Sequence, residues 1–151
     1  MMLKLDPRNN SAWNHRFYSL KNSKNLTIKD IESELNFSFE NISAVPDNES
    51  VWNYFYGILE DNITVIKENK DLAEKAKNII LEIIKTCNKF QTEFINKNNE
   101  IEDESETKRS IRYILSFLTE IFALNFNFIS KNETETVLIF IKFSLFYIFR
   151  D

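Results

Sequence analysis

The stretch Pro7-Arg8-Asn9-Asn10-Ser11-Ala12-Trp13-Asn14 recurs later in the chain as Pro46-Asp47-Asn48-Glu49-Ser50-Val51-Trp52-Asn53. Five residues return at the same places, namely Pro, Asn, Ser, Trp and a second Asn, and the two tryptophans are 52 − 13 = 39 residues apart. A period near forty residues is typical of stacked helical hairpins, in which neighbouring units cover each other's apolar faces. The repeat therefore predicts an all-α fold, an alpha-alpha superhelix built as a solenoid of antiparallel helical hairpins.

The composition agrees with a helical chain. Of 151 residues only one is glycine and two are proline, while 43% are apolar, so the chain has few helix breakers and enough apolar surface for a core. We expect a single domain over residues 1–151 with clear repeats at 5–20 and 45–61. The remainder, 62–151, is a looser helical region that contains an acidic connector at 96–106.

Each copy of the repeat contains a helix-start signal. Pro7 and Pro46 push the residue before them away from helical angles, and Ser11 and Ser50 are residues that cap helix N-termini. With these serines as caps, each tryptophan lies in the first turn of its helix. The predicted helices are 11–20 and 50–61.

Three further segments have helical patterns. Thr27 and Asp30 form a capping pair, and the apolar positions after them predict a helix that ends near Val45. Apolar residues at steps of three and four predict an amphipathic helix over 71–94 and another over 111–128. The nearly all-apolar segment 137–149 would span roughly 20 Å as a helix, short of the roughly 30 Å of a bilayer core, so we expect no membrane span.

Charge and cysteine content exclude several classes of function. The net charge of −4 and pI near 5.2 argue against binding to nucleic acid, which normally needs a basic face. The only cysteine, Cys87, leaves no internal disulfide, and with the only histidine, His15, it supplies too few ligands for a zinc site. The N-terminus has no secretory signal pattern, so we expect a cytoplasmic protein.

The repeated strings also resemble a known family. Residues 6–16 and 45–59 look like two consecutive prenyltransferase alpha-subunit repeats, and they are most similar to later repeats of the alpha subunits shared by protein farnesyltransferases and type I protein geranylgeranyltransferases. Trp13 followed by Arg16 matches the family hallmark, whereas Phe55 stands where the second copy would have arginine. A weaker similarity covers 112–122. We interpret the chain as the C-terminal half of such a subunit.

The resemblance implies a function in a heterodimer. In the family the alpha subunit is a crescent of hairpins around a beta subunit, which supplies zinc, with magnesium as a second candidate metal, and most of the substrate pocket. The implied reaction transfers farnesyl or geranylgeranyl from a prenyl diphosphate to the cysteine of a C-terminal Cys-aliphatic-aliphatic-X (CaaX) signal. This chain would scaffold the beta subunit. No residue here matches the family's diphosphate-facing lysine, and prenyl specificity stays open.

The candidate functional residues follow the two tryptophans. Trp13 and Trp52 are expected to anchor their hairpins in the core, with partner binding as the alternative. Polar side chains one to three residues further on form the candidate interface with the beta subunit: Asn14, His15, Arg16, Asn53 and Tyr54. The alternative for Arg16 is a structural hydrogen bond to carbonyls of the adjoining hairpin. We expect no catalytic, cofactor-binding or metal-binding residue in this chain.

Two other functions remain as hypotheses. In the first hypothesis, the chain is a stand-alone helical-repeat scaffold that binds a peptide or a helix on its concave surface without catalysis. In the other it is the alpha subunit of the related Rab geranylgeranyltransferase, although the strings around Trp13 and Trp52 favour the first enzyme.

Overall fold

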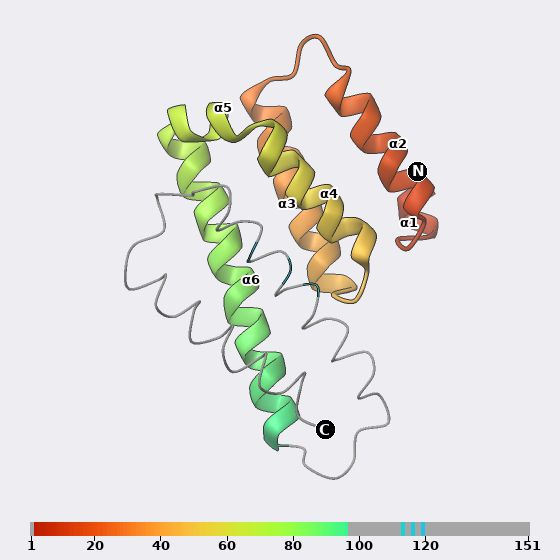
Figure 1. The fold of residues 1–151 in the computed structure, drawn as a ribbon, viewed down its shortest axis with the longest axis vertical. Helices are drawn as coiled ribbons and strands as arrows, with labels where there is room; N and C mark the ends of the chain where they lie inside the picture. Colours follow the sequence, from red (N-terminus) through yellow and green to blue (C-terminus); the bar gives the residue numbers. More distant parts are fainter. Residues whose placement is uncertain (1, 97–112, 114–115, 117–118, 120–151) are drawn as a thin grey trace. The chain divides into compact units, whose positions relative to one another are not determined.

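The computed structural model describes residues 2–96, 113, 116 and 119, with side chains over residues 3–86 and at the last three positions. The chain divides into two compact units, Met1–Ile79 and Ile80–Asp151. All regular structure in the described residues is helical, which confirms the all-α prediction (Figure 1). The helices are α1 (Met2–Leu5), α2 (Asn10–Lys21), α3 (Ile28–Ala44), α4 (Glu49–Asp61), α5 (Ile63–Glu68) and α6 (Lys70–Asn96).

The two repeated strings form α2 and α4, and their caps differ from the prediction. The N-cap residues are Asn9 and Asn48, whose side-chain oxygens accept hydrogen bonds from the backbone N–H groups of Ala12 at 3.0 Å and Ser50 at 3.3 Å. Both asparagines have the extended backbone of a cap, whereas Ser11 and Ser50 already lie in the first helical turn. The expectation of serine caps was therefore wrong, and each helix begins one residue earlier.

Helix α3 begins and ends as the sequence predicts. Thr27 and Asp30 form a capping box, in which the Thr27 backbone N–H donates to Asp30 Oδ2 at 2.8 Å and the Asp30 N–H donates to Thr27 Oγ1 at 3.2 Å. The helix ends at Ala44, next to the expected Val45. Its buried face is Ile31, Leu35, Ser38 and Ile42.

Unit Met1–Ile79 is built around α4, which packs against both α2 and α3. Successive helices α2, α3 and α4 alternate in direction, as expected for antiparallel hairpins (Figure 1). The close approach of α2 to α4 depends on Gly57, because a Cβ built there would lie 2.8 Å from the Phe17 ring. The largest fully buried side chains of this unit include Trp13, Leu35, Phe55, Ile58 and Leu59.

Two short helices were not predicted. Helix α1 has a single turn, too short for an apolar period to show, and α5 follows α4 directly, with Asn62 between them. Helix α6 matches the predicted 71–94 helix, and Asn69 caps its start by accepting from the Leu72 N–H at 2.9 Å.

Several predictions fall outside the described residues. These are the acidic connector 96–106 beyond Asn96, the side chain of Cys87, the apolar segment 137–149, and most of the 111–128 helix, of which Tyr113, Ser116 and Thr119 are helical. The single domain over 1–151 also stays a prediction. None of the helices in the described part of the chain combines the length and hydropathy needed to cross a bilayer.

Candidate functional site

In each repeat, the tryptophan side chain forms a hydrogen bond with the proline carbonyl of the loop that precedes its helix. We call this contact the tryptophan–proline closure. The indole N–H of Trp13 donates to the carbonyl oxygen of Pro7 at 2.7 Å, and that of Trp52 donates to the carbonyl oxygen of Pro46 at 2.8 Å. Both rings are buried. A buried indole needs a partner for its single donor, and the preceding proline carbonyl provides one. The sequence repeat is thus also a repeat of hydrogen-bonding geometry.

The two loops are also joined to each other. The side-chain amide of Asn48 donates to the Pro7 carbonyl oxygen at 2.7 Å, so this oxygen accepts from both repeats. Arg8 Nη2 lies 2.6 Å from Asp47 Oδ1, and these two residues occupy the same position in successive copies. The Asp47 side chain is buried, so the ion pair with the arginine offsets the cost of removing this carboxylate from water. These contacts fix the register of α2 against α4.

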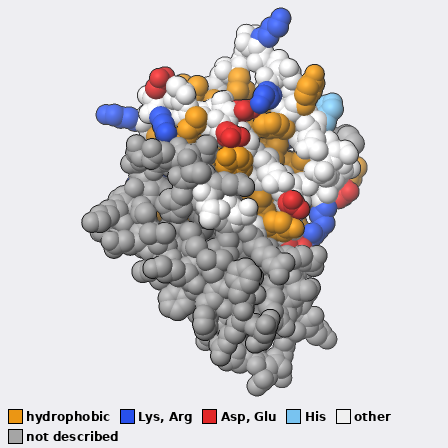
Figure 2. All heavy atoms as spheres, in the orientation of Figure 1, with side chains coloured by type: hydrophobic (Ala, Val, Ile, Leu, Met, Phe, Trp, Pro, Cys, Tyr) orange, Lys and Arg blue, Asp and Glu red, His pale blue; other side chains and the backbone are white. Residues whose placement is uncertain are grey.

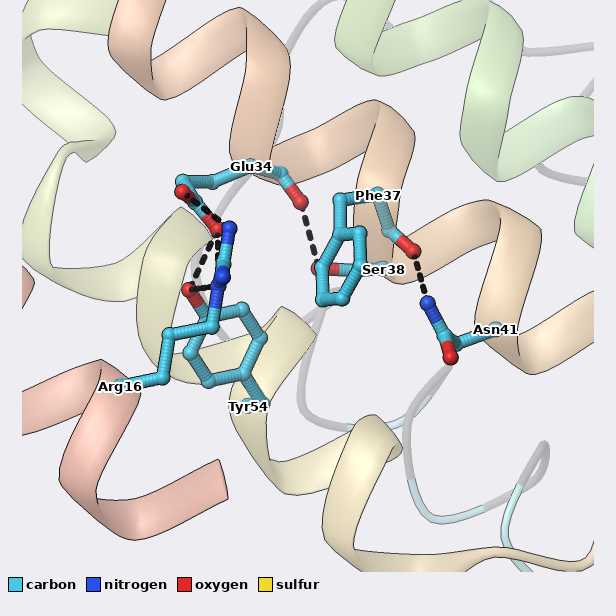
Figure 3. Close-up of polar contacts among 6 residues, drawn as sticks. All are labelled: Arg16, Glu34, Phe37, Ser38, Asn41 and Tyr54. Carbon is cyan, nitrogen blue, oxygen red and sulfur yellow. Dashed lines mark hydrogen bonds and ion pairs between the residues drawn. The ribbon is translucent and has the colours of Figure 1, made fainter. Parts of the chain in front are cut away.

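A polar cluster of three side chains joins α2, α3 and α4, and we call it the Arg16 cluster: Arg16, Glu34 and Tyr54 (Figure 3). Arg16 grips the Glu34 carboxylate with two bonds, from Nε at 2.8 Å and from Nη2 at 2.7 Å. The Tyr54 hydroxyl donates to Glu34 Oε2 at 2.6 Å and accepts from Arg16 Nε at 3.2 Å. Each residue comes from a different helix, so the cluster ties all three together.

Electrostatics keep Arg16 charged and Tyr54 neutral. Burial raises the pKa of the Tyr54 phenol, and its hydrogen bond to Glu34 and the charge of that carboxylate raise it further. For Arg16, desolvation opposes the charged form, but the hydrogen bond and charge of Glu34 outweigh it, so the pKa of the guanidinium is raised. The cluster therefore holds one ion pair and one neutral hydroxyl donor.

Aromatic rings surround the Arg16 cluster. The Arg16 guanidinium carbon lies 4.2 Å from the centroid of the Phe37 ring, a cation–π distance. Trp13 packs against Phe37 and Tyr54, with ring centroids 5.6 Å and 5.1 Å apart. The cluster is consequently a structural joint between the two repeats, formed beside the tryptophan that anchors the first.

The five candidate interface residues divide into two groups. Asn14, His15 and Asn53 are exposed, whereas Arg16 is half-buried and Tyr54 is 3% exposed. The structural alternative for Arg16 takes a different form from the one expected, because its partners are a carboxylate and a phenol rather than carbonyls. Whether any of the five contacts a partner stays a prediction.

Sequence reasoning did not find Glu34 and Phe37, the α3 partners of Arg16. Both lie outside the repeated string, on a helix whose motif concerns its cap and its buried stripe. A charged residue at the edge of that stripe was the only available signal.

An open groove of about 980 Å³ runs beside Arg16, between α1, α2 and α3. We call it the α2 groove, and His15, Ser19 and Leu20 of α2 line it together with Glu34 of α3. On the face drawn in Figure 2, the described part mixes apolar side chains with acidic and basic ones. Within that part, no three His, Cys, Asp or Glu side chains come together as a group that could hold a metal ion.

The repeat geometry coincides with a family match. Residues 1–23 and 31–61 match the model described as protein prenyltransferase alpha subunit repeat. These two segments are similar to prenyltransferase alpha-subunit repeats. Each contains one of the two tryptophan–proline closures, so the matched sequence and the repeated geometry describe the same units.

The chain is also similar to curated proteins with one name. The protein farnesyltransferase/geranylgeranyltransferase type-1 subunit alpha of Dictyostelium discoideum is 43% identical over 61 residues, 39% of this chain and 19% of the relative. The subunits of the same name from Pisum sativum and Arabidopsis thaliana are 34% and 36% identical, over 59% and 40% of this chain. The chain spans only 19% to 26% of these relatives. No solved structure matches it significantly.

Proposed function

We propose that this chain is the alpha subunit, or part of the alpha subunit, of a heterodimeric protein prenyltransferase. The enzyme would transfer farnesyl or geranylgeranyl to the cysteine of C-terminal CaaX signals in the cytoplasm. The observation that carries the proposal is the pair of tryptophan–proline closures, 39 residues apart, within segments that match the alpha-subunit repeat. The shared name of the three relatives supports the same enzyme class.

The proposal gives this chain the task of holding a partner rather than performing chemistry. One histidine and one cysteine do not make the nitrogen and sulfur ligand set that zinc requires, so the chain does not fit the metal, and we assign zinc to the beta subunit. The Arg16 cluster and the joined loops serve to keep the hairpins in fixed register. A rigid surface lowers the entropic cost of binding, since less has to be ordered in the complex.

Asn14 and Asn53 are the strongest candidates for contact with the beta subunit. They occupy the same position in the two copies, and both are exposed. No hydrogen bond joins either side chain to another described residue, so the repeat keeps an asparagine that its own fold does not use. Because the two amides occupy the same position on successive repeats, a partner that runs along the hairpins could contact both in the same way.

The test is co-expression with the beta subunit that accompanies the Dictyostelium discoideum relative. The wild-type pair should co-purify as a one-to-one complex and prenylate a CaaX peptide. Replacing both amides, Asn14→Lys with Asn53→Lys, should weaken the complex at least about tenfold, because desolvated lysines at an interface cost more than 1.4 kcal/mol. The melting temperature of the free chain should stay unchanged.

A matched control is Asn36→Lys, an exposed position of α3 outside the repeated string, which should leave the complex intact. A wild-type chain that remains monomeric beside a folded beta subunit would refute the proposal and favour the stand-alone scaffold.

A further inference from the structure

A cavity smaller than the α2 groove lies between α2, α4 and the loop that joins α2 to α3, and we call it the Asn62 cavity. Its volume is about 280 Å³. Its apolar lining consists of Phe17 and Leu20 of α2, Leu26 of the loop and Ile58 of α4. An engineered apolar cavity of about 150 Å³ binds benzene, and sites for drug-sized ligands begin at about 300 Å³. The Asn62 cavity therefore has room for a single substituted ring.

Asn62 supplies a buried hydrogen-bond acceptor to this cavity. The residue lies between α4 and α5, lines the cavity and is 9% exposed. Its side-chain N–H donates to the Ile58 carbonyl oxygen at 2.8 Å, and because a carbonyl only accepts, this bond fixes which end of the amide is the oxygen. The side-chain oxygen does not cap α5, and no described residue donates to it.

Other asparagines at helix boundaries use or expose this oxygen. Asn9, Asn48 and Asn69 each cap the following helix with it. Asn22 follows α2 as Asn62 follows α4, and its amide likewise donates to the carbonyl four residues earlier, at 2.7 Å. Asn22 is exposed, however, so water can reach its oxygen. A buried acceptor without a donor costs free energy, so closing the end of α4 explains the amide of Asn62 but not the burial of its oxygen.

The aromatic wall of the cavity is fixed by its neighbours. The Phe17 ring packs so closely on Gly57 that a Cβ there would lie 2.8 Å from it. It also meets the Tyr54 ring edge-on, with centroids 6.1 Å apart, and the Lys21 ammonium lies 5.6 Å from its centroid. A wall that is already held in position has little to order when a ligand binds, which favours binding.

The charged groups of the cavity lie at its exposed end. Lys21 Nζ is 2.9 Å from Asp61 Oδ2, and the two side chains are 58% and 32% exposed, whereas Ile58 is fully inaccessible. One positive and one negative group leave the lining without net charge. An ion in the cavity would lose hydration and gain no counter-charge, so the lining suits a neutral molecule.

We propose that the Asn62 cavity binds a small neutral molecule that consists of one aromatic ring with one hydroxyl or N–H donor. The ring lies against Phe17 and the aliphatic side chains, and the donor bonds to Asn62 Oδ1. The complementary groups are thus an apolar slot of one-ring size and a single buried acceptor. This binding goes beyond the proposed prenyltransferase function, because it involves neither a beta subunit nor a CaaX signal.

The experiment compares phenol with toluene, which have nearly the same shape and differ in the hydroxyl donor. Each is titrated into the isotope-labelled full chain, and its affinity is obtained from the shifts of backbone amide signals. Toluene leaves water more readily than phenol, so the informative quantity is the ratio of the two affinities. This ratio is measured in the wild type and in Asn62→Leu, which keeps the approximate shape of the side chain and removes the acceptor.

The ratio of phenol affinity to toluene affinity should be at least about tenfold higher in the wild type than in Asn62→Leu, because only the wild type offers the hydrogen bond. The matched control is Asn22→Leu, which removes the same local motif at an exposed position and should keep the wild-type ratio. Wild-type spectra locate the ligand without any variant. The ring protons of bound phenol should show nuclear Overhauser contacts to the methyl groups of Leu26 and Ile58.

Phenol that gives no saturable shift in the wild type, or that contacts other residues, would overturn the proposal. So would an equal affinity ratio in a folded Asn62→Leu chain, or the same loss of ratio in Asn22→Leu. Should Asn62→Leu fail to fold, the contacts of phenol in the wild type decide alone. All these measurements use this chain by itself, so their failure is distinguishable from failure of the prenyltransferase proposal.

Discussion

Replacing Glu34 by glutamine removes the centre of the Arg16 cluster with little change in shape. The Glu34 carboxylate accepts two bonds from Arg16 and one from Tyr54, and its side chain is 13% exposed. A glutamine keeps one acceptor oxygen and turns an NH₂ group toward donors, so at least one of these bonds is lost. The ion pair is lost as well.

The magnitude lies between two limits. Breaking a fully buried pair costs about 3–5 kcal/mol, and an exposed pair is worth about 0–1 kcal/mol. The Arg16 side chain is 38% exposed, so water partly screens the pair and the lower half of this interval applies. We expect Glu34→Gln to lower the free energy of unfolding by about 2 kcal/mol, which corresponds to a fall of about 4–8 °C in Tm for a chain of this size.

The assay is urea unfolding of the full chain, followed by tryptophan fluorescence. Both tryptophans lie in the unit Met1–Ile79, and Trp13 contacts Tyr54, so fluorescence reports on the helices that the cluster joins. The control is Glu40→Gln, an exposed glutamate of the same helix, which should change the free energy by less than about 0.5 kcal/mol. A Glu34→Gln variant as stable as the wild type, or a control equally destabilised, would refute a structural role for the cluster.

Three further predictions concern single contacts. The pKa of Tyr54 is raised in the folded chain, so the contribution of Tyr54 to stability is present below the ordinary tyrosine pKa of 10.0 and is lost as pH rises above it. In Tyr54→Phe, the free energy of unfolding should therefore fall less steeply at alkaline pH than in the wild type. The pKa of Asp30 is lowered by the hydroxyl and then the backbone N–H of Thr27, so its contribution is lost as pH falls below the ordinary 3.8, and Asp30→Asn should flatten the acid fall in the same titration. Gly57→Ala should destabilise by about 1 kcal/mol in urea unfolding, since overpacking against Phe17 costs more than the helix propensity gained, and Phe17→Leu in the same chain should remove that cost.

The repeat made much of the local fold predictable. A tryptophan and an asparagine recurring after 39 residues predicted two equivalent helices, and both form with an asparagine cap at the same position and with equivalent indole hydrogen bonds. The pair Thr27 and Asp30 predicted the start of α3, because a capping box needs only residues three apart. These signals are local, so a single sequence contains them in full.

The identity of the caps was less predictable for a local reason as well. Asparagine and serine compete as caps within each string, and their preferences are nearly equal. The loop geometry after Pro7 and Pro46 decides between them, and it places Asn9 and Asn48 in the extended conformation that a cap requires.

The composition of the Arg16 cluster depends on tertiary packing. Arg16 was predicted as a site residue because it follows Trp13 by three positions in the sequence. Its carboxylate partner, Glu34, is 18 residues away in the sequence and lies on another helix. Tyr54 was expected among interface residues, and it is buried because α4 lies against both α2 and α3. Helical periodicity assigns a face to a residue, but only the arrangement of neighbouring helices determines what covers that face.

The most direct test of the whole account is the mass in solution of the particle formed when the chain is co-expressed with a prenyltransferase beta subunit. Light scattering on the eluting peak should give the mass of one beta subunit plus the 18.0 kDa of this chain. Two separate peaks, with the beta subunit folded and this chain alone in its own fraction, would contradict the assignment of these repeats to a prenyltransferase.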